Sequence, residues 1–396
     1  MNSRTLKDLL VLSDSGVWGD EDETSGVNIL RSTNFNSDGT LDFSKKALRF
    51  VDLKVRNSKF LQSGDILLEK SGGGPRQPVG RVCLYRGDSS SNSFGNFIAR
   101  LRPSEDIVPE YLFFFLRYFH ISGRTAYYQK QTTGIRNLEF KRYLSIEVPL
   151  PLMGEQQRTV DLLARAESIL RLRREAEKKA AELVPALFIQ MFGDPSINPK
   201  AWPLCRLDDV AQIISGVTKG RKLGAEESVE LPYMRVANVK DGYLDLSDIK
   251  TIAVRPSEID KYRLQPGDLL LTEGGDPDKL GRGALWSGEI ECCLHQNHIF
   301  KVRAQEESVL PEYLLELVGS HYGKAYFLSV AKKTTGIASI NRTQLGRFPV
   351  LLPPMALQRA FVDRVSALRA LQSQQAAATA QAQASFDALL ARAFAA

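Results

Sequence analysis

The chain has 396 residues, 43% of them apolar and 25% charged, which is too long for one ordinary hydrophobic core and predicts two folded domains. Lys and Arg outnumber Asp and Glu by 52 to 46, a surplus that permits a polyanionic partner without requiring one. Four cysteines without CxxC spacing, no apolar secretion signal and no stretch long enough to span a bilayer favour a soluble protein of the reducing cytoplasm, with no membrane partner.

Several short motifs occur twice in the same order, about half the chain apart. The clearest pairs are residues 61–68 with 264–271, Gly80-Arg81 with Gly281-Arg282, residues 109–112 with 311–314, and residues 132–135 with 334–337. Near the start of each half, an Arg-x-x-Asn motif ends at Asn34 and at Asn238. Because order and spacing both survive, the sequence predicts a tandem duplication.

Each half is expected to fold as a mixed α/β domain. It begins with a short amphipathic segment, such as residues 207–214, and continues with short strands separated by Gly, Asp and Ser. Aliphatic runs after a Gly-Asp turn predict strands over 65–68 and 268–271. The Pro-Glu-Tyr-Leu segments predict helix starts at Pro109 and Pro311, because Pro suits the first turn of a helix.

In each half, a predicted strand ends in a Pro-containing segment, at 148–151 and at 350–354, and a long segment of helix-forming residues follows. Apolar side chains in these segments recur at steps of three and four, which is the seam of a coiled coil. The expected seam of the first segment is Leu162, Ala166, Ile169, Arg173, Ala176, Ala180, Leu183 and Leu187. The expected seam of the second is Phe361, Val365, Leu368, Gln372, Gln375, Thr379, Ala382, Phe386 and Leu389.

The Ala- and Gln-rich run at 372–384 leaves a frayed tail as the alternative to a helix, and we favour the helix because the seam resumes at Phe386. Pro185 predicts a kink or an end of the first helix near Val184. The expected boundaries are a first domain at 1–152, a helix at 153–193, a linker at 194–203, a second domain at 204–353 and a second helix at 354–396.

Together these features resemble the specificity subunit of type I restriction-modification systems over nearly the whole chain. The segments that carry the resemblance are residues 132–157, their counterpart 334–358, and the linker that begins at Gly193. The family usually has Pro-Leu-Pro-x-x-x-Gln in each half. Residues 352–358 begin with Leu-Pro-Pro instead of Pro-Leu-Pro, which leaves the start of that helix open. The resemblance implies an α/β fold with two tandem mixed α/β target-recognition domains, separated by two long helices that form an antiparallel coiled coil.

By the same resemblance, each domain recognises one part of a split target in double-stranded DNA, and the helices act as spacer and docking surface. Two methyltransferase subunits, with restriction or translocase subunits where present, complete the complex. The chain itself is expected to be non-catalytic and without a cofactor, since S-adenosylmethionine belongs to the methyltransferase subunit. A seam of ~30 residues spans ~45 Å, enough to bridge major-groove sites one turn, roughly 34–36 Å, apart.

Loops with cations, amides and flexible backbone are the candidate DNA contacts, because phosphates and base edges need such donors. A glycine-rich loop contributes Lys70, Arg76 and Gln77, for which a solvated turn is an equal alternative. The densest basic cluster outside the helices is Lys219, Arg221 and Lys222, and DNA is favoured there over a solvated loop.

The two Thr-Thr-Gly loops hold hydroxyls and cations suited to gripping phosphates. Because they occur in both halves, the structural alternative is a loop that closes the strand before the long helix. Their candidate contacts, together with the duplicated arginines, are Lys130, Thr132, Thr133, Arg136, Lys332, Lys333, Thr334, Thr335, Arg342, Arg81 and Arg282.

Other chemistries have weaker support. Residue types that can bind zinc occur at Cys292, Cys293, His295 and His298. The corresponding positions of the first half hold no metal-binding residues, so no metal site is expected. The chain lacks a phosphate-binding loop, the Asn/Asp-Pro-Pro-aromatic motif of amino-methyltransferases and a complete nuclease motif. A DNA specificity subunit is the leading hypothesis. The alternatives are a tandem scaffold that binds protein or carbohydrate, and a stand-alone DNA-modifying enzyme.

Overall fold

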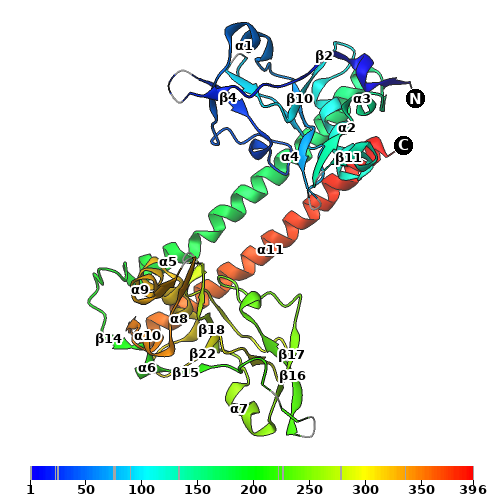
Figure 1. Ribbon diagram of the computed structural model, residues 1–396. Coiled ribbons are helices and arrows are strands. Elements are labelled where there is room, and N and C mark those ends of the chain that lie inside the picture. Colours follow the sequence, from blue (N-terminus) through cyan, green and yellow to red (C-terminus); the bar gives the residue numbers. More distant parts are fainter. Residues whose placement is uncertain are drawn as a thin grey trace. The chain divides into compact units, whose positions relative to one another are not determined.

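The computed structural model describes residues 2–22, 24, 26–74, 77–89, 91–132, 134–221, 223–224, 227–276, 279–334 and 336–395 (Figure 1). The chain divides into two compact units. Unit 1 consists of Met1–Arg174 and Ala377–Ala396, and unit 2 of Glu175–Ala376. Both boundaries fall within the long helices, so each unit holds a segment of each helix.

The main sheet of both units has four antiparallel strands in the same order. In unit 1 the order is β2 (Leu10–Ser15), β10 (Ile98–Pro103), β6 (Ile66–Glu69) and β8 (Val82–Leu84). In unit 2 it is β15 (Ala211–Ser215), β22 (Ile299–Ala304), β18 (Leu269–Thr272) and β20 (Gly283–Leu285). The predicted strands after the Gly-Asp turns are thus confirmed as β6 and β18, and they are buried along their whole length.

The Gly-Asp turn recurs because its aspartate is a buried anchor. Asp65 accepts from the Gln62 backbone N–H at 2.8 Å and from Nε of Arg102 at 2.7 Å. Asp268 makes the same contacts, with Gln265 N–H and with Arg303 Nε, both at 2.7 Å. Each carboxylate is 1% exposed, so the paired arginine offsets the cost of burying its charge.

A second sheet contains one parallel pair in each unit. In unit 1 its order is β3 (Asp20–Glu21), β5 (Leu48–Phe50), β4 (Val27–Leu30) and β9 (Asn92–Phe94), with β4 and β9 parallel. In unit 2 it is β17 (Lys250–Val254), β16 (Val229–Met234) and β21 (Leu294–His295), with β16 and β21 parallel. The Asn of the repeated Arg-x-x-Asn motif is buried after β4 and after β16, where Asn34 Nδ2 donates to Asp42 O and Asn238 Nδ2 to Asp245 O.

The amphipathic segment expected at the start of the second half consists of two short elements. The amphipathic segment 207–214 is a single helical turn, α6 (Leu207–Val210), followed at once by strand β15. Leu207, Val210, Ala211 and Ile213 are all buried, so the helical turn and the strand share one apolar face, and their spacing imitates a longer helix.

The predicted helix starts are confirmed, with Pro at the first position of α2 (Pro109–Ile121) and of α8 (Pro311–Gly319). The long segments form α4 (Met153–Ala181), α5 (Leu183–Phe192) and α11 (Met355–Phe394), so the Ala- and Gln-rich run is helical as favoured. The break between α4 and α5 lies at Glu182, and Pro185 sits in the first turn of α5, where its missing N–H has little cost.

A buried glutamine fixes the start of each long helix. Oε1 of Gln156 accepts from Val108 N–H at 2.9 Å, and its Nε2 donates to Pro151 O at 3.0 Å. Gln358 accepts from Leu310 N–H at 2.9 Å and donates to Pro353 O at 2.9 Å. The irregular Pro353-Pro354 sequence therefore leaves the helix start where the duplication places it.

In unit 1 the α4 seam differs by one position from the predicted one. Leu163 and Leu170 are buried, whereas Leu162 and Ile169 are 52% and 51% exposed. The α11 seam was predicted correctly at Phe386, and with Leu390 and Phe394 this side chain packs among the aromatic residues of α2. The rings of Tyr111 and Phe394 are 5.2 Å apart, and α2 and the end of α11 lie side by side in Figure 1.

In unit 2, α5 takes the place that the end of α11 has in unit 1. Phe188 and Phe192 of α5 pack against Tyr313 of α8, with ring centroids 5.5 and 4.8 Å apart, and against Phe361 of α11. Each unit is thus completed by the helix that ends the other half of the sequence.

The ion pairs between the domain helices and the long helices have opposite polarity in the two units. In unit 1, Arg117 of α2 pairs with Glu167 of α4 at 2.7 Å. In unit 2, Glu316 of α8 pairs with Arg369 of α11, also at 2.7 Å. Glu167 and Arg369 both lie 11 residues after the buried glutamine of their helix, so the same helical position carries opposite charges.

No helix within the described parts of the chain is long and apolar enough to cross a membrane.

Candidate nucleic-acid interface

A three-stranded sheet brings two of the predicted DNA-contact loops of unit 1 together. Strands β11 (Gln129–Thr132) and β12 (Ile135–Leu138) form a hairpin around Gly134, and β12 pairs with β7 (Ser71–Gly73) of the glycine-rich loop. The register aligns Arg136 with Gly73. A Cβ at Gly73 would lie 2.7 Å from a Val79 methyl carbon, so only glycine permits this pairing.

Unit 2 has the same sheet. Strands β23 (Lys332–Thr334) and β24 (Ile337–Ser339) form the hairpin, and β24 pairs with β19 (Gly274–Gly275). Gly134 and Gly336 both have positive φ, 85° and 82°, which the hairpin turns require and which explains the repeated glycine.

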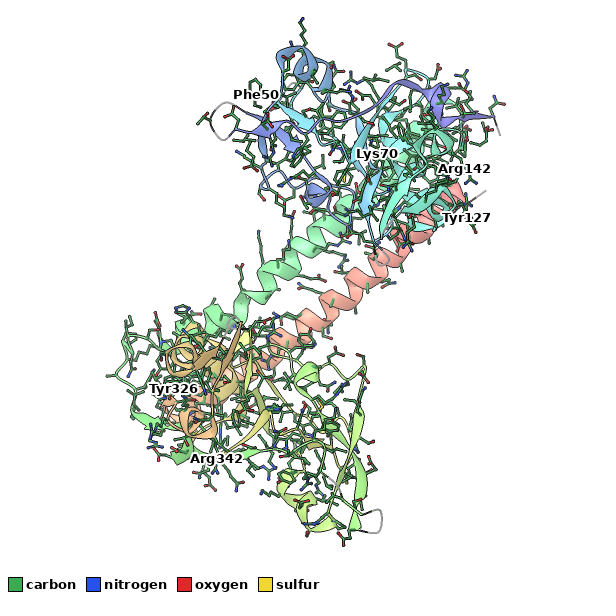
Figure 2. The ribbon with its side chains drawn as sticks, viewed as in Figure 1. Phe50, Lys70, Tyr127, Arg142, Tyr326 and Arg342 are labelled. Carbon is green, nitrogen blue, oxygen red and sulfur yellow. The ribbon has the colours of Figure 1, made fainter. Side chains whose placement is uncertain are left out.

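The predicted cations of these hairpins differ in exposure and in partners. The Lys130 side chain is 72% exposed and pairs with Glu139, a surface contact that a phosphate can replace at little cost. Arg136 is half-buried, and Lys332 and Lys333 are exposed on β23. Arg342 is exposed in the first turn of α10 (Arg342–Gly346), and Figure 2 labels it in unit 2.

Some predicted contacts lie outside the described residues, namely Arg76, Thr133, Lys222 and Thr335. Only the backbone of Thr132 and Thr334 is described, as the last residue of β11 and of β23.

The two duplicated arginines have different surroundings. Arg81 forms a bidentate pair with the buried Glu69, at 2.7 and 2.9 Å, and also donates to Ser32 O at 3.2 Å. Its role in this structure is to join β6 to the segment before β5. Glu69 is replaced by Thr272 in unit 2, where Arg282 forms no ion pair within the described part of the chain. Gln77, with its side-chain oxygen toward Arg81, accepts from that guanidinium at 3.0 Å.

The basic loop of unit 2 is also partly engaged. Nη1 of Arg221 donates to Oε1 of Glu258 at 2.8 Å, whereas Lys219 is exposed. The corresponding loop of unit 1 is acidic and aromatic: Glu21 pairs with Arg49 at 2.7 Å, and the Arg49 guanidinium lies 4.4 Å from the Trp18 ring centroid. The same position in the fold thus has opposite charge in the two units.

Sequence reasoning missed the exposed aromatic side chains of unit 1. Phe50, Tyr127 and Phe97 are 59%, 76% and 51% exposed. Arg142, labelled with Phe50 and Tyr127 in Figure 2, donates to Tyr127 O at 2.9 Å and lies 5.1 Å from the Tyr128 ring centroid. Cations beside aromatic rings are a common feature of nucleic-acid surfaces. These aromatic residues share no common signal in the sequence, because their neighbours along the chain differ and isolated aromatic residues are also frequent in cores.

His295, one of the metal-ligating residue types, is a core residue. It is fully buried, and its ring nitrogens lie 2.9 Å from Tyr262 O and 3.2 Å from Ile214 O. Burial lowers the pKa of His295 to about 4 and raises that of Cys293 to about 12. Among the described residues no group of three or more His, Cys, Asp or Glu side chains is placed to hold a metal ion.

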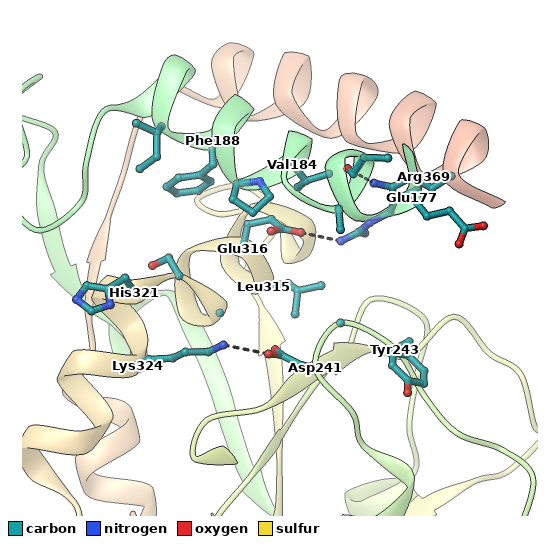
Figure 3. Close-up of a pocket in the computed structure, with 18 of the residues that line it drawn as sticks. Glu177, Val184, Phe188, Asp241, Tyr243, Leu315, Glu316, His321, Lys324 and Arg369 are labelled. Atoms are coloured by element: carbon teal, nitrogen blue, oxygen red, sulfur yellow. Dashed lines mark hydrogen bonds and ion pairs between the residues drawn. The ribbon is translucent and has the colours of Figure 1, made fainter. Parts of the chain in front are cut away.

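A groove of about 920 Å³ in unit 2 lies between the long helices, α8 and the loop at Asp241 (Figure 3). Its charged side chains include two ion pairs, Glu316 with Arg369 at 2.7 Å and Lys324 with Asp241 at 3.0 Å. Burial raises the pKa of Glu316, and the Arg369 charge opposes that shift. The first pair joins α8 to α11, and the second joins α9 (His321–Val330) to the Asp241 loop, so both have a structural role.

The fold and the loops define a protein made of two like units, each with a hairpin sheet that presents cations. Residues 21–182 match the family model of the type I restriction modification DNA specificity domain.

Relatives and solved structures extend this match along the chain. The type I restriction enzyme EcoKI specificity subunit of Escherichia coli is 25% identical over 335 residues, which cover 79% of this chain and 69% of that protein. A protein of Methanocaldococcus jannaschii named as the MjaX specificity subunit is 28% identical over 163 residues, which cover 41% of this chain and only 38% of that protein. A chain from a study of complex assembly and conformational transition of the type I R-M system has a TM-score of 0.61 at 20% identity, with 99% of this chain and 97% of that chain covered.

The crystal structure of the type I S subunit of M. genitalium has a TM-score of 0.53 at 15% identity and covers 99% of this chain and 96% of that one. At these identities the two structures establish the fold, and the sequence matches establish the relationship. The sequence matches show that the chain is similar to type I restriction enzyme specificity subunits, and that residues 21–182 carry the match to the DNA specificity domain.

Proposed function

We propose that this chain recognises a bipartite target in double-stranded DNA, with one half bound by each unit. The observation that carries the proposal is the repeated hairpin sheet: the same backbone framework occurs in both units, while the side chains around it differ in charge and type. A common framework with different exposed side chains suits two domains that bind DNA in the same way but recognise different base sequences.

The chain is proposed to act as a non-catalytic member of a complex with two methyltransferase subunits, and with a restriction subunit where present. The segments of α4 and α11 are proposed to form an antiparallel coiled coil that sets the gap between the half-targets. The exposed Leu162, Ile169 and Leu172 of α4 support docking of a protein subunit, because apolar side chains this exposed on a helix suit a protein contact.

Sequencing of modified bases tests the proposal directly. The chain is co-expressed with its methyltransferase subunit in cells without other modification enzymes. We expect a modified adenine on each strand of one split motif, because two units bind two separated sequences. Modified bases in a short continuous motif, or none at all despite an assembled complex, would contradict the proposal.

A further inference from the structure

A tight turn before β10 and before β22 has the same backbone hydrogen bonds in both units. Ile98 N–H donates to Gly95 O and Ile299 N–H to Gln296 O, each at 2.9 Å. The residue before each of these isoleucines is Phe97 in unit 1 and His298 in unit 2. The turn therefore presents these two residues in the same backbone geometry.

This turn is joined to the hairpin sheet through one further residue. Lys70 N–H donates to Phe97 O at 2.9 Å, and Leu138 N–H of β12 donates to Lys70 O at 2.8 Å. In unit 2, Glu273 N–H donates to His298 O at 3.0 Å, and Ile340 N–H donates to Glu273 O at 2.9 Å. The turn, the glycine strand and the hairpin thus form one framework in each unit.

The side chains on this framework are chemically opposite. In unit 1 the Lys70 ammonium donates to Ser15 Oγ at 2.8 Å, and Phe97 lies next to Gly72, where an added Cβ would be 3.4 Å from its ring. In unit 2 the His298 ring Nδ1 is 2.7 Å from Oε2 of Glu273. Unit 1 therefore offers a donor and an apolar ring, and unit 2 offers a carboxylate and an imidazole.

Core packing does not explain the difference, because Phe97 and His298 are exposed and Lys70 and Glu273 are only half-buried. Phe97 is 51% exposed, and the His298 side chain is 57% exposed. The backbone is kept, whereas the pair of side chains changes its charge and its hydrogen-bonding capacity. This is the pattern expected where two copies of a framework have different ligands.

We propose that the pairs Lys70/Phe97 and Glu273/His298 determine base preference at equivalent positions of the two half-targets, an inference that rests on the proposed function. Lysine donates to guanine O6 and N7, and an aromatic ring contacts the thymine methyl group, so unit 1 favours guanine or thymine there. A carboxylate accepts from the amino groups of cytosine N4 and adenine N6, so unit 2 favours cytosine or adenine.

The test exchanges the pairs in the full chain within its complex with the methyltransferase subunits. Lys70→Glu/Phe97→His is expected to shift one position of the first half-target from guanine or thymine to cytosine or adenine, by roughly tenfold or more in relative methylation. Glu273→Lys/His298→Phe is expected to make the reverse change in the second half-target only. Ile121→His, at an exposed site at the end of α2, is the control and leaves the motif unchanged.

Thermal melting of each variant verifies that the fold is kept, and the milder variants Lys70→Gln and Phe97→Leu are expected to relax the same position. A variant complex that assembles and methylates the original motif unchanged overturns the inference and leaves the proposed function standing. Loss of assembly with the methyltransferase subunits, from a chain that still melts normally, also overturns it, because the turn is then a protein contact. Absence of any motif from the unaltered complex would instead refute the proposed function.

Discussion

Single buried polar side chains hold the repeated units together, and each has a definite set of partners. Gln156 and Gln358 each bond three backbone groups, and Asp65 and Asp268 each close a turn and pair with an arginine. The spacing of these residues was visible in the sequence as repeated motifs. Their partners were not, because the Val108 N–H that Gln156 accepts from is 48 residues away along the chain.

Gln156→Ala is expected to destabilise unit 1 by about 1–3 kcal/mol, since it leaves the Val108 N–H without its acceptor in a buried site. Denaturant unfolding of the chain measures the loss. Gln157→Ala is the matched control, because Gln157 is exposed and bonds only within its helix to Asp161. Equal stability of the two variants would show that the buried glutamine does not fix the helix start.

Histidines in both units make the fold sensitive to acid. Burial lowers the pKa of His120 to about 4, and burial does the same to His295. Because the unfolded state binds these protons from about pH 6.5 downward, the unfolding free energy falls as pH drops from 6.5 through 4.

His120→Phe removes one of these titrating groups while keeping a ring of similar size, so it is expected to flatten the acid limb of a plot of Tm against pH. His321→Phe, at an exposed site, is expected to leave that limb as steep as in the unaltered chain. An unchanged acid limb in His120→Phe would show that this histidine is not held neutral by the fold.

At the scale of helices and strands, the sequence predicted which elements form and not which faces they use. The α4 segment has apolar residues in adjacent pairs, Leu162 with Leu163 and Ile169 with Leu170, so two seams fit the same spacing. Packing on α2 selects the second residue of each pair. The pairing of β7 with the β11–β12 hairpin joins segments about sixty residues apart, and no local pattern indicates it.

The ion pairs of opposite polarity predict that each long helix is stabilised on the domain helix of its own unit, α2 or α8, by a specific pair of charges. Arg117→Glu or Glu167→Arg alone is expected to destabilise unit 1 by about 3–5 kcal/mol, because each leaves like charges in a part-buried contact. The double variant recreates the polarity of unit 2 and is expected to recover at least half of the loss. A double-mutant cycle measures this coupling. Strictly additive losses would show that the pair does not act as a unit.

The hairpin lysines are expected to contact phosphates. Lys332→Ala/Lys333→Ala should weaken duplex binding at every sequence and reduce the slope of log K against log salt by roughly 1–2, since each phosphate contact contributes about 0.9. Lys178→Ala/Lys179→Ala, an exposed pair on α4, is the control. A slope that falls as much in the control, or in neither, would remove the hairpin from the DNA interface.

For the whole molecule, the duplication was evident in the sequence. The structure shows the same strand order in the main sheet of both units. The family model matches only residues 21–182, yet unit 2 repeats the same framework with different loops. What the sequence did not show is that the halves exchange their ends: residues 377–396 complete unit 1, and α5 completes unit 2. The functional division into half-targets is therefore expected to follow the domains at 1–152 and 204–353, since the exchanged helices are common scaffold.

Exchange of one domain tests that division most directly. Residues 1–152 are replaced by the corresponding domain of another specificity subunit, and the modified bases made by the complex are sequenced. We predict that one half of the methylated motif changes completely, while the other half and the gap between them stay the same. A chimera that assembles with its methyltransferase subunits and loses or changes both halves would contradict independent recognition by two units.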